Sequence, residues 1–214
     1  MRILCYFSAV LELHSLACVR GGRSLYKDVS LNVADAQLLR VTGKNGAGKT
    51  SLLRTLCGLM APAAGQVRWN GVDVQRLRDE FNRQLIYVGH AAALKDELSA
   101  SENLVAAAQL SGHAVSAEVA KAALAQAGLS GRERVLARNL SQGQRRRVAL
   151  ARLAVNNFAK LWILDEPFNA LDTSATEWLL GLINNHLARG GMVVLTSHQT
   201  VALPESNLQV MLAL

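Results

Sequence analysis

A glycine-rich segment at residues 43–50 has the spacing G-x-x-x-x-G-K-T, which is typical of a loop that binds phosphate groups. Its glycines allow successive backbone N–H groups to point at phosphate oxygens, and the N-terminus of the helix that follows adds a positive dipole. Lys49 is expected to contact the outer phosphates, and the Thr50 hydroxyl is expected to bind Mg²⁺. The segment therefore predicts a nucleoside triphosphate site. The candidate nucleotide-binding residues are those of this segment and the next residue, Ser51: Gly43, Lys44, Asn45, Gly46, Ala47, Gly48, Lys49, Thr50 and Ser51.

An acidic pair directly follows the apolar run at residues 161–164. Such a run is typical of a buried parallel strand, and we expect its carboxyl end to lie close to the phosphate-binding loop. Asp165 would then hold Mg²⁺ through its water shell, and Glu166 would accept a proton from the water that attacks the γ-phosphate. A hydrophobic run that ends in Asp-Glu is common, so this interpretation depends on its pairing with the loop.

A third motif, Leu-Ser-Gln-Gly-Gln at residues 140–144, stands immediately before an arginine-rich segment with helical periodicity. With the loop and the acidic pair, it resembles the signature L-S-G-G-Q of the ATP-binding subunits of ABC transporters, with Gln142 in place of a glycine. The resemblance extends over nearly all 214 residues. It implies ATP and Mg²⁺ as cofactors, and a homodimer in which Ser141, Gly143 and Gln144 serve the nucleotide held by the other subunit.

Two further segments stand where this family has conserved motifs. Residues 169–172 are similar to the family's D-loop, and His198, which follows a predicted strand, stands where the family has a switch histidine. The resemblance implies that His198 hydrogen-bonds the γ-phosphate and acts beside Glu166 in catalysis. A single histidine at a strand end is usually a solvated or capping residue, so this role depends on the other motifs.

The chain departs from the family pattern at two places. Residues 87–90 read Tyr-Val-Gly-His where the family normally has a glutamine after the strand. Arg20 or a neighbour stands where the family has an aromatic residue that stacks on adenine. A guanidinium can also stack on a base, so we expect adenine binding to be retained, with base selectivity left open.

The Val-Gly-His variant and four other blocks are similar to one branch of this family, the ATP-binding subunits of the cytochrome c maturation system, also called the haem exporter. The blocks are residues 101–104, 125–129, 144–153 and 162–172. The resemblance implies a peripheral protein on the cytoplasmic face of a bacterial inner membrane. Its implied partners are an integral membrane subunit of the same complex and haem-handling membrane proteins, with hydrolysis tied to release of a haem-loaded chaperone.

Other functions stay open at this point. One is the ATPase subunit of another small ABC transporter, and another is a soluble ABC ATPase that acts on ribosomes or DNA. The soluble class usually has two cassettes or a long coiled-coil insertion, for which 214 residues leave no room. A third is a regulatory module that binds nucleotide without hydrolysing it, and Glu166 argues against that module.

Hydrophobic periodicity indicates which elements must position these residues. The predicted strands lie at residues 10–19, 29–33, 37–42, 65–71, 85–88, 161–164 and 192–196. The predicted helices follow the phosphate-binding loop, fill much of residues 99–156 and occupy residues 173–188. We therefore predict an α/β fold of the P-loop ABC ATPase cassette class, with one domain over residues 1–214. Its mixed-sheet core would comprise residues 1–88 and 156–214, and its inserted helical subdomain residues 89–155.

The composition is that of a folded globular chain, with 50% hydrophobic residues, 18% charged residues and 3 prolines. The 23 basic and 16 acidic residues give a net charge of +7, which favours an anionic partner. Aromatic residues are only 5%, which disfavours a platform for stacking nucleic-acid bases. The arginine run at residues 145–147 points in three directions on a helix, so we interpret it as a solvated face and expect no nucleic-acid partner.

The apolar run at residues 3–11 is shorter than the roughly 20 residues that span a bilayer, and no signal-peptide cleavage site follows it. Histidines without a cysteine or carboxylate at ligand spacing predict that this chain binds no haem or metal directly through them. These histidines are His90, His113 and His186. The cysteines, which form no C-x-x-C pair and are expected to be small buried residues, are Cys5, Cys18 and Cys57.

Overall fold

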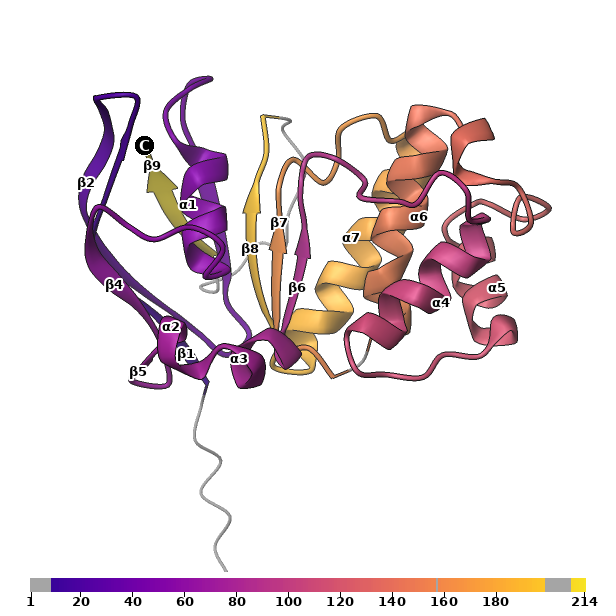
Figure 1. Ribbon diagram of the computed structural model, residues 1–214, viewed down its shortest axis with the longest axis horizontal. Coiled ribbons are helices and arrows are strands. Elements are labelled where there is room, and N and C mark those ends of the chain that lie inside the picture. Colours follow the sequence, from indigo (N-terminus) through magenta and orange to yellow (C-terminus); the bar gives the residue numbers. More distant parts are fainter. Residues whose placement is uncertain (1–8, 157, 199–208) are drawn as a thin grey trace, which may run out of the picture.

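The computed structural model describes residues 9–156, 158–198 and 209–214 (Figure 1). The expected cysteine at position 5 and most of the apolar run at residues 3–11 lie outside these residues. Cys18 and Cys57 are buried, as predicted. Within the described ranges, no helix combines the length and the apolar character that crossing a membrane requires.

A parallel sheet of five strands forms the centre of the molecule, in the order β6-β7-β8-β3-β9. Its strands are β3 (Leu38–Thr42), β6 (Leu85–Val88), β7 (Leu161–Leu164), β8 (Met192–Thr196) and β9 (Gln209–Ala213). Every residue of β7 and β8 is buried, because a parallel sheet is covered on both faces. The apolar runs that predicted four of these strands reflect that burial, and β9 is a strand that the sequence pattern did not reveal.

A second, antiparallel sheet lies at one side of the molecule, in the order β2-β1-β4-β5 (Figure 1). Its strands are β1 (Val10–Arg20), β2 (Arg23–Ala34), β4 (Ala64–Trp69) and β5 (Val72–Asp73). The turn between β4 and β5 is Asn70-Gly71, and both residues have positive φ, 52° and 79°. A two-residue hairpin of this kind favours Asn-Gly, so the strand predicted at residues 65–71 ends in a turn, and the short return strand β5 follows as an element that the sequence pattern did not reveal.

Helix α1 (Lys49–Leu56) packs between the two sheets, and α7 (Thr173–Ala188) covers the opposite face of the parallel sheet. Alternate residues of the parallel strands supply the two cores. Leu39, Ile163 and Val194 belong to the α1 side, whereas Leu38 and Trp162 belong to the α7 side. The two-residue period of a strand therefore holds the sheet between two apolar layers.

Three helices form a separate apolar cluster at the far side of the molecule from the antiparallel sheet (Figure 1). They are α4 (Ala100–Leu110), α5 (Ala117–Gln126) and α6 (Gln142–Val155). Short elements complete the chain: α2 (Val74–Leu77), α3 (Asp79–Arg83) and the 3-10 turn η1 (Ala137–Asn139). Ser99 and Glu102 form a capping box that begins α4, with Ser99 N donating to Glu102 Oε2 over 2.8 Å.

A buried histidine, His186, lies in the last turn of α7. The His186 ring stacks on Trp162 with centroids 3.8 Å apart and planes 6° from parallel. Burial is the main reason that the pKa of His186 falls from 6.5 to about 4, and the charges of Arg189 and Lys160 lower it further. Hydrogen bonds with the backbone at Lys160 and Met192 oppose the shift.

This lowered pKa predicts a loss of stability in mild acid. Unfolded His186 takes up a proton near pH 6.5 and folded His186 only near pH 4, so its contribution is full above pH 6.5 and is lost as the pH falls toward 4. Between pH 7 and pH 5 the expected loss in free energy of unfolding is on the order of 2 kcal/mol. Urea unfolding across this range measures it. His186→Phe should remove that component, whereas His14→Phe should retain it, and equal pH dependence of His186→Phe and wild type would contradict the assignment.

Candidate functional site

A cavity of about 570 Å³ opens where the carboxyl ends of β3, β7 and β8 meet the N-terminus of α1. We call this end of the parallel sheet the carboxyl edge. Figure 1 shows the N-terminal ends of α1 and α6 on the same side as the carboxyl ends of β6, β7 and β8. The residues that line the cavity are Arg20, Leu25, Asn45, Gly46, Gly48, Lys49, Thr50, Ser51, His90, Asp165, Glu166, Asn169 and His198.

The glycine-rich loop wraps the end of α1 in a conformation that needs glycine. Gly48 caps the helix with φ 107°, and Gly43 has φ 146°. A Cβ at Gly43 would lie 2.7 Å from the Leu214 backbone oxygen, and one at Gly48 would lie 3.0 Å from the Leu25 Cβ. Close backbone approach and left-handed φ therefore both exclude side chains at these two positions.

Lys49, the first residue of α1, is held across the loop rather than in solvent. Its Nζ donates to the carbonyl oxygens of Gly43, over 2.9 Å, and Lys44, over 3.2 Å. The side chain is buried and lines the cavity. An ammonium group beside the loop and the helix dipole gives this end of the cavity a positive potential, which favours anionic groups.

Thr50 and Asp165 meet at the carboxyl edge although they lie far apart in the sequence. Thr50 Oγ1 donates to Asp165 Oδ2 over 2.8 Å. Thr196, at the end of β8, donates from Oγ1 to Asp165 Oδ1 over 2.8 Å. Thr196 Oγ1 also accepts from Glu166 N over 2.8 Å. A hydroxyl and a carboxylate facing one another are oxygen donors of the kind that Mg²⁺ prefers, with phosphates supplying further ligands.

Glu166 is held in a strained backbone conformation. Its φ is 49°, which is unusual for a residue other than glycine, and its side chain is almost fully buried. Glu166 Oε2 accepts from His198 N over 3.2 Å, and His198 Nε2 lies 3.2 Å from Glu166 Oε1. The carboxylate that the sequence analysis assigned to proton transfer and the predicted switch histidine thus lie in direct contact.

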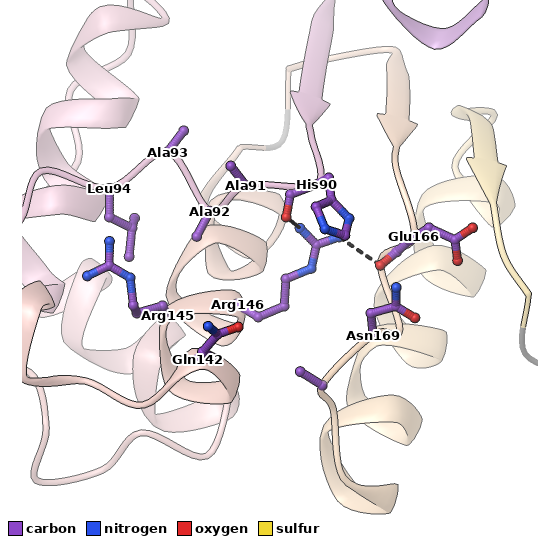
Figure 2. A pocket seen from close by; sticks show the side chains of 11 residues that line it. His90, Ala91, Ala92, Ala93, Leu94, Gln142, Arg145, Arg146, Glu166 and Asn169 are labelled. Atoms are coloured by element: carbon purple, nitrogen blue, oxygen red, sulfur yellow. Dashed lines mark hydrogen bonds between the residues drawn. The ribbon is translucent and has the colours of Figure 1, made fainter. Parts of the chain in front are cut away.

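Two residues at positions where the sequence departs from the family pattern also line the cavity. His90 is exposed after β6 and lines both this cavity and a neighbouring one of about 400 Å³, whose lining Figure 2 shows. Arg20, at the end of β1, lines the other side with Leu25. Among the described residues that line the cavity, none is phenylalanine, tyrosine or tryptophan.

The residues of the third motif lie at the start of α6 and do not line the cavity of their own chain. Ser141 caps α6, and its Oγ accepts from Gln144 N over 3.2 Å while Ser141 N donates to Gln144 Oε1 over 2.9 Å. A Cβ at Gly143 would lie 2.8 Å from the Ala170 backbone oxygen. The motif therefore forms a capped helix N-terminus at the carboxyl edge, packed closely on the segment after Glu166.

The interpretation of residues 145–147 as a solvated face is wrong for its central member. Arg146 is 6% exposed and donates to backbone carbonyls around the site. Arg145 pairs with Asp96 over 2.6 Å, and Arg147 donates to the Gly128 carbonyl over 3.4 Å. Helical periodicity places the three side chains in different directions but does not show which direction is inward.

Two contributors were missed by the sequence analysis. Thr196 has no motif of its own, and only its position at the end of a buried parallel strand could have suggested it. Arg146 could not be distinguished in the sequence from Arg145 and Arg147, which adjoin it. In the described ranges, no group of three histidine, cysteine or acidic side chains forms a metal cluster.

The chain is similar to known proteins. A family model described as "ABC transporter" matches residues 26–169. A protein of Dechloromonas aromatica (strain RCB), named cytochrome c biogenesis ATP-binding export protein CcmA, is 50% identical over 200 residues, which cover 94% of this chain and 98% of that protein. A protein of the same name from Nitrosomonas europaea (strain ATCC 19718) is 47% identical, over 91% of each chain.

A solved structure has a similar fold. It is a dimeric ATP-binding cassette in a post-hydrolysis state, bound to ADP and Pi, with a TM-score of 0.76 and 25% sequence identity. The similarity covers 88% of each chain.

The position of Lys49 predicts its contribution to nucleotide binding. Lys49→Ala should lose a charge-assisted phosphate contact of roughly 1.5 to 3 kcal/mol, which weakens triphosphate binding by about 10-fold to about 150-fold. Titration with a fluorescent ATP analogue measures this change. Lys160→Ala is the matched control, because Lys160 pairs with Asp35 over 3.0 Å and does not line the cavity. Equal affinities of Lys49→Ala and wild type would contradict the assignment of the loop.

Proposed function

This chain belongs to the ABC transporter family and, within it, to the cytochrome c biogenesis ATP-binding export proteins, and we propose that it is the ATP-hydrolysing subunit of a haem export and cytochrome c biogenesis complex. The resemblance and the α/β cassette fold predicted from the sequence are confirmed by these similarities. The enzyme class is that of an ATP hydrolase coupled to a membrane translocase.

One observation supports the catalytic assignment above all. The phosphate-binding loop, the acidic pair and His198 line one cavity, and the Thr50–Asp165 hydrogen bond of 2.8 Å joins two of these segments. We propose that the loop residues 43–51 hold the ATP phosphates and that Thr50 and Asp165 hold Mg²⁺, Asp165 through water. When bound, Mg²⁺ offsets the negative charge of the phosphate oxygens.

The chain's own residues would then carry the hydrolytic step. Glu166 accepts the proton of the attacking water, because its carboxylate is buried at the cavity wall and its backbone N–H is fixed by Thr196. His198 now contacts Glu166, and a γ-phosphate oxygen would offer its ring a competing hydrogen-bond acceptor. The side chain would therefore change partner when ATP binds, which suits a residue that reports the γ-phosphate.

We propose a homodimer as the active unit. Ser141, Gly143 and Gln144 do not line their own chain's cavity, yet they form a helix N-terminus at the same edge of the molecule. A second copy placed head to tail would bring this N-terminus onto the γ-phosphate, where the helix dipole favours negative charge. The similar solved cassette is dimeric, which supports this arrangement.

We propose the cytoplasmic face of a bacterial inner membrane as the location, with the chain bound peripherally to an integral membrane subunit and, through it, to haem-handling membrane proteins. The names of the curated relatives support this placement. The membrane subunit would contact the cavity beside His90 and would move when the dimer closes. ATP hydrolysis would drive release of the haem-loaded chaperone. Haem itself and nucleic acid are not expected to bind this chain.

The role of Glu166 predicts a trapped state. Glu166→Gln should bind ATP with Mg²⁺ but fail to hydrolyse it, because an amide cannot accept the proton. The variant should therefore accumulate as a closed dimer with ATP and remain monomeric with ADP, measured by light scattering after size-exclusion chromatography. Glu177→Gln, on α7, is the control and should behave as wild type. Wild-type hydrolysis by Glu166→Gln would show that another group is the base.

The proposed pathway predicts a cellular phenotype. Deletion of the gene should remove holo forms of periplasmic c-type cytochromes, seen as loss of the haem-stained bands. The wild-type gene should restore them and the Lys49→Ala gene should not. Normal c-type cytochromes in the deletion strain would assign this ATPase to a different transporter.

A further inference from the structure

Arg146, in the second turn of α6, holds together two loops of the site (Figure 2). Its Nη2 donates to the carbonyl oxygens of Asp165, over 2.7 Å, and Glu166, over 2.9 Å. Its Nη1 donates to the carbonyl of Gly89, over 2.6 Å, with the His90 carbonyl 3.5 Å away. One planar group thus contacts the ends of β6 and β7, which carry His90 and Glu166.

These contacts are made by a charge that is taken out of water. Arg146 is 6% exposed, and in the described part of the chain no carboxylate oxygen lies within ion-pairing distance of it. Burial lowers the pKa of its guanidinium, and the nearby charges of Asp165 and Glu166 oppose that shift. A buried cation is costly unless polar groups compensate for it, and here backbone carbonyls do so. The compensation is available only while both loops keep their positions.

The strained backbone of Glu166 is fixed from both sides by this arrangement. Thr196 Oγ1 accepts from Glu166 N over 2.8 Å, and Arg146 binds the carbonyl of the same residue. A φ of 49° costs free energy and persists only where the surroundings determine it. Arg146 and Thr196 therefore fix the backbone of Glu166, which sets the direction of its carboxylate, while His198 contacts the carboxylate itself.

Arg146 also belongs to the helix that presents the third motif. Gly143 and Gln144 lie less than one turn before it on α6. Arg146 lines the neighbouring cavity of about 400 Å³ but not the one of about 570 Å³ that the phosphate-binding loop lines, so its route to the chemistry runs through the backbone of Glu166 and His90. A displacement of α6 would consequently displace both of these residues.

We infer that Arg146 is a positioning residue that makes the N-terminus of α6, the Glu166 loop and the His90 loop one rigid unit. This inference rests on the proposed ATP hydrolysis. When the motif of α6 engages the nucleotide of a second copy, the same movement sets Glu166 in its own chain's site. The two sites of the dimer are thereby linked through the interior of each subunit.

The inference predicts a loss of turnover without a loss of nucleotide binding. Arg146→Gln should lower kcat by between about 10-fold and about 100-fold, since small misplacements of a catalytic group have effects of this size. The affinity for ATP should stay within about twofold, because the loop residues that hold the phosphates are untouched. Arg146→Lys should keep an intermediate kcat, because a single ammonium cannot bridge the carbonyls that the planar fork reaches.

The experiment measures kcat and KM of the purified full chain with ATP and Mg²⁺, together with ATP affinity and the melting temperature. Arg152→Gln is the matched control: Arg152 lies on the same helix, its pKa is lowered by burial, and it lines neither cavity of the site. It should lower the melting temperature and leave kcat unchanged. Arg146→Lys is the variant that retains a buried cation if Arg146→Gln does not fold.

The outcomes separate this inference from the function on which it rests. If the wild-type chain hydrolyses ATP and the Arg146 variants have a reduced kcat with retained ATP affinity, both the function and the inference are supported. If the wild-type chain hydrolyses ATP and the Arg146 variants have an unchanged kcat, the inference alone is overturned. An equal loss of kcat in Arg152→Gln and Arg146→Gln also overturns the inference alone. A wild-type chain that binds ATP without hydrolysing it overturns the proposed function and the inference together.

Discussion

The hydrogen bond between Thr50 and Asp165 is the contact on which the site depends. It joins the start of α1 to the end of β7, and these segments are brought together only because β3, β8 and β7 run parallel in one sheet. Since β8 lies between β3 and β7, its last residue, Thr196, completes the link by bonding both Asp165 and Glu166. Apolar layers on both faces of the sheet hold the strand ends in register, so the polar groups need little reorganisation to meet a ligand.

Charges at this edge are stabilised by backbone dipoles more than by opposite charges. Lys49 donates to the loop carbonyls and Arg146 to carbonyls of two strand ends, while Glu166 is reached by His198. For Lys49, which lines the cavity, this arrangement leaves the ammonium group available to a ligand, because a carbonyl is a weaker competitor for a cation than a phosphate. The same arrangement makes the site rigid, since each buried charge loses its compensation if a strand end moves.

Sequence patterns predicted the parts of the site that local chain geometry dictates. The glycine-rich loop needs its glycines for left-handed φ at Gly48 and for close approach at Gly43, so it leaves a motif. The run before Asp165 is apolar because β7 is buried on both faces. Thr196 and Arg146 left no such signal, because their roles come from neighbours that only the folded sheet and the packing of α6 supply.

The fold shows the same division. The buried strands were visible as apolar runs and the helices as periodic patterns, whereas β9 and the short β5, α2 and α3 were not. A two-residue strand such as β5 is defined by its pairing with β4 across the Asn70-Gly71 turn, which no periodicity can reveal. Arg20 and His90 are departures from the family pattern that the sequence did show, and the structure places both at the wall of the cavity.

A structure of the Glu166→Gln variant with ATP and Mg²⁺ tests the central claim most directly. The account predicts Mg²⁺ between the Thr50 hydroxyl and the Asp165 carboxylate, and Lys49 Nζ turned from the Gly43 and Lys44 carbonyls to the phosphates. It also predicts the Ser141 end of a second copy on the γ-phosphate. A nucleotide bound away from residues 43–50, or a metal held without Thr50 and Asp165, would contradict it.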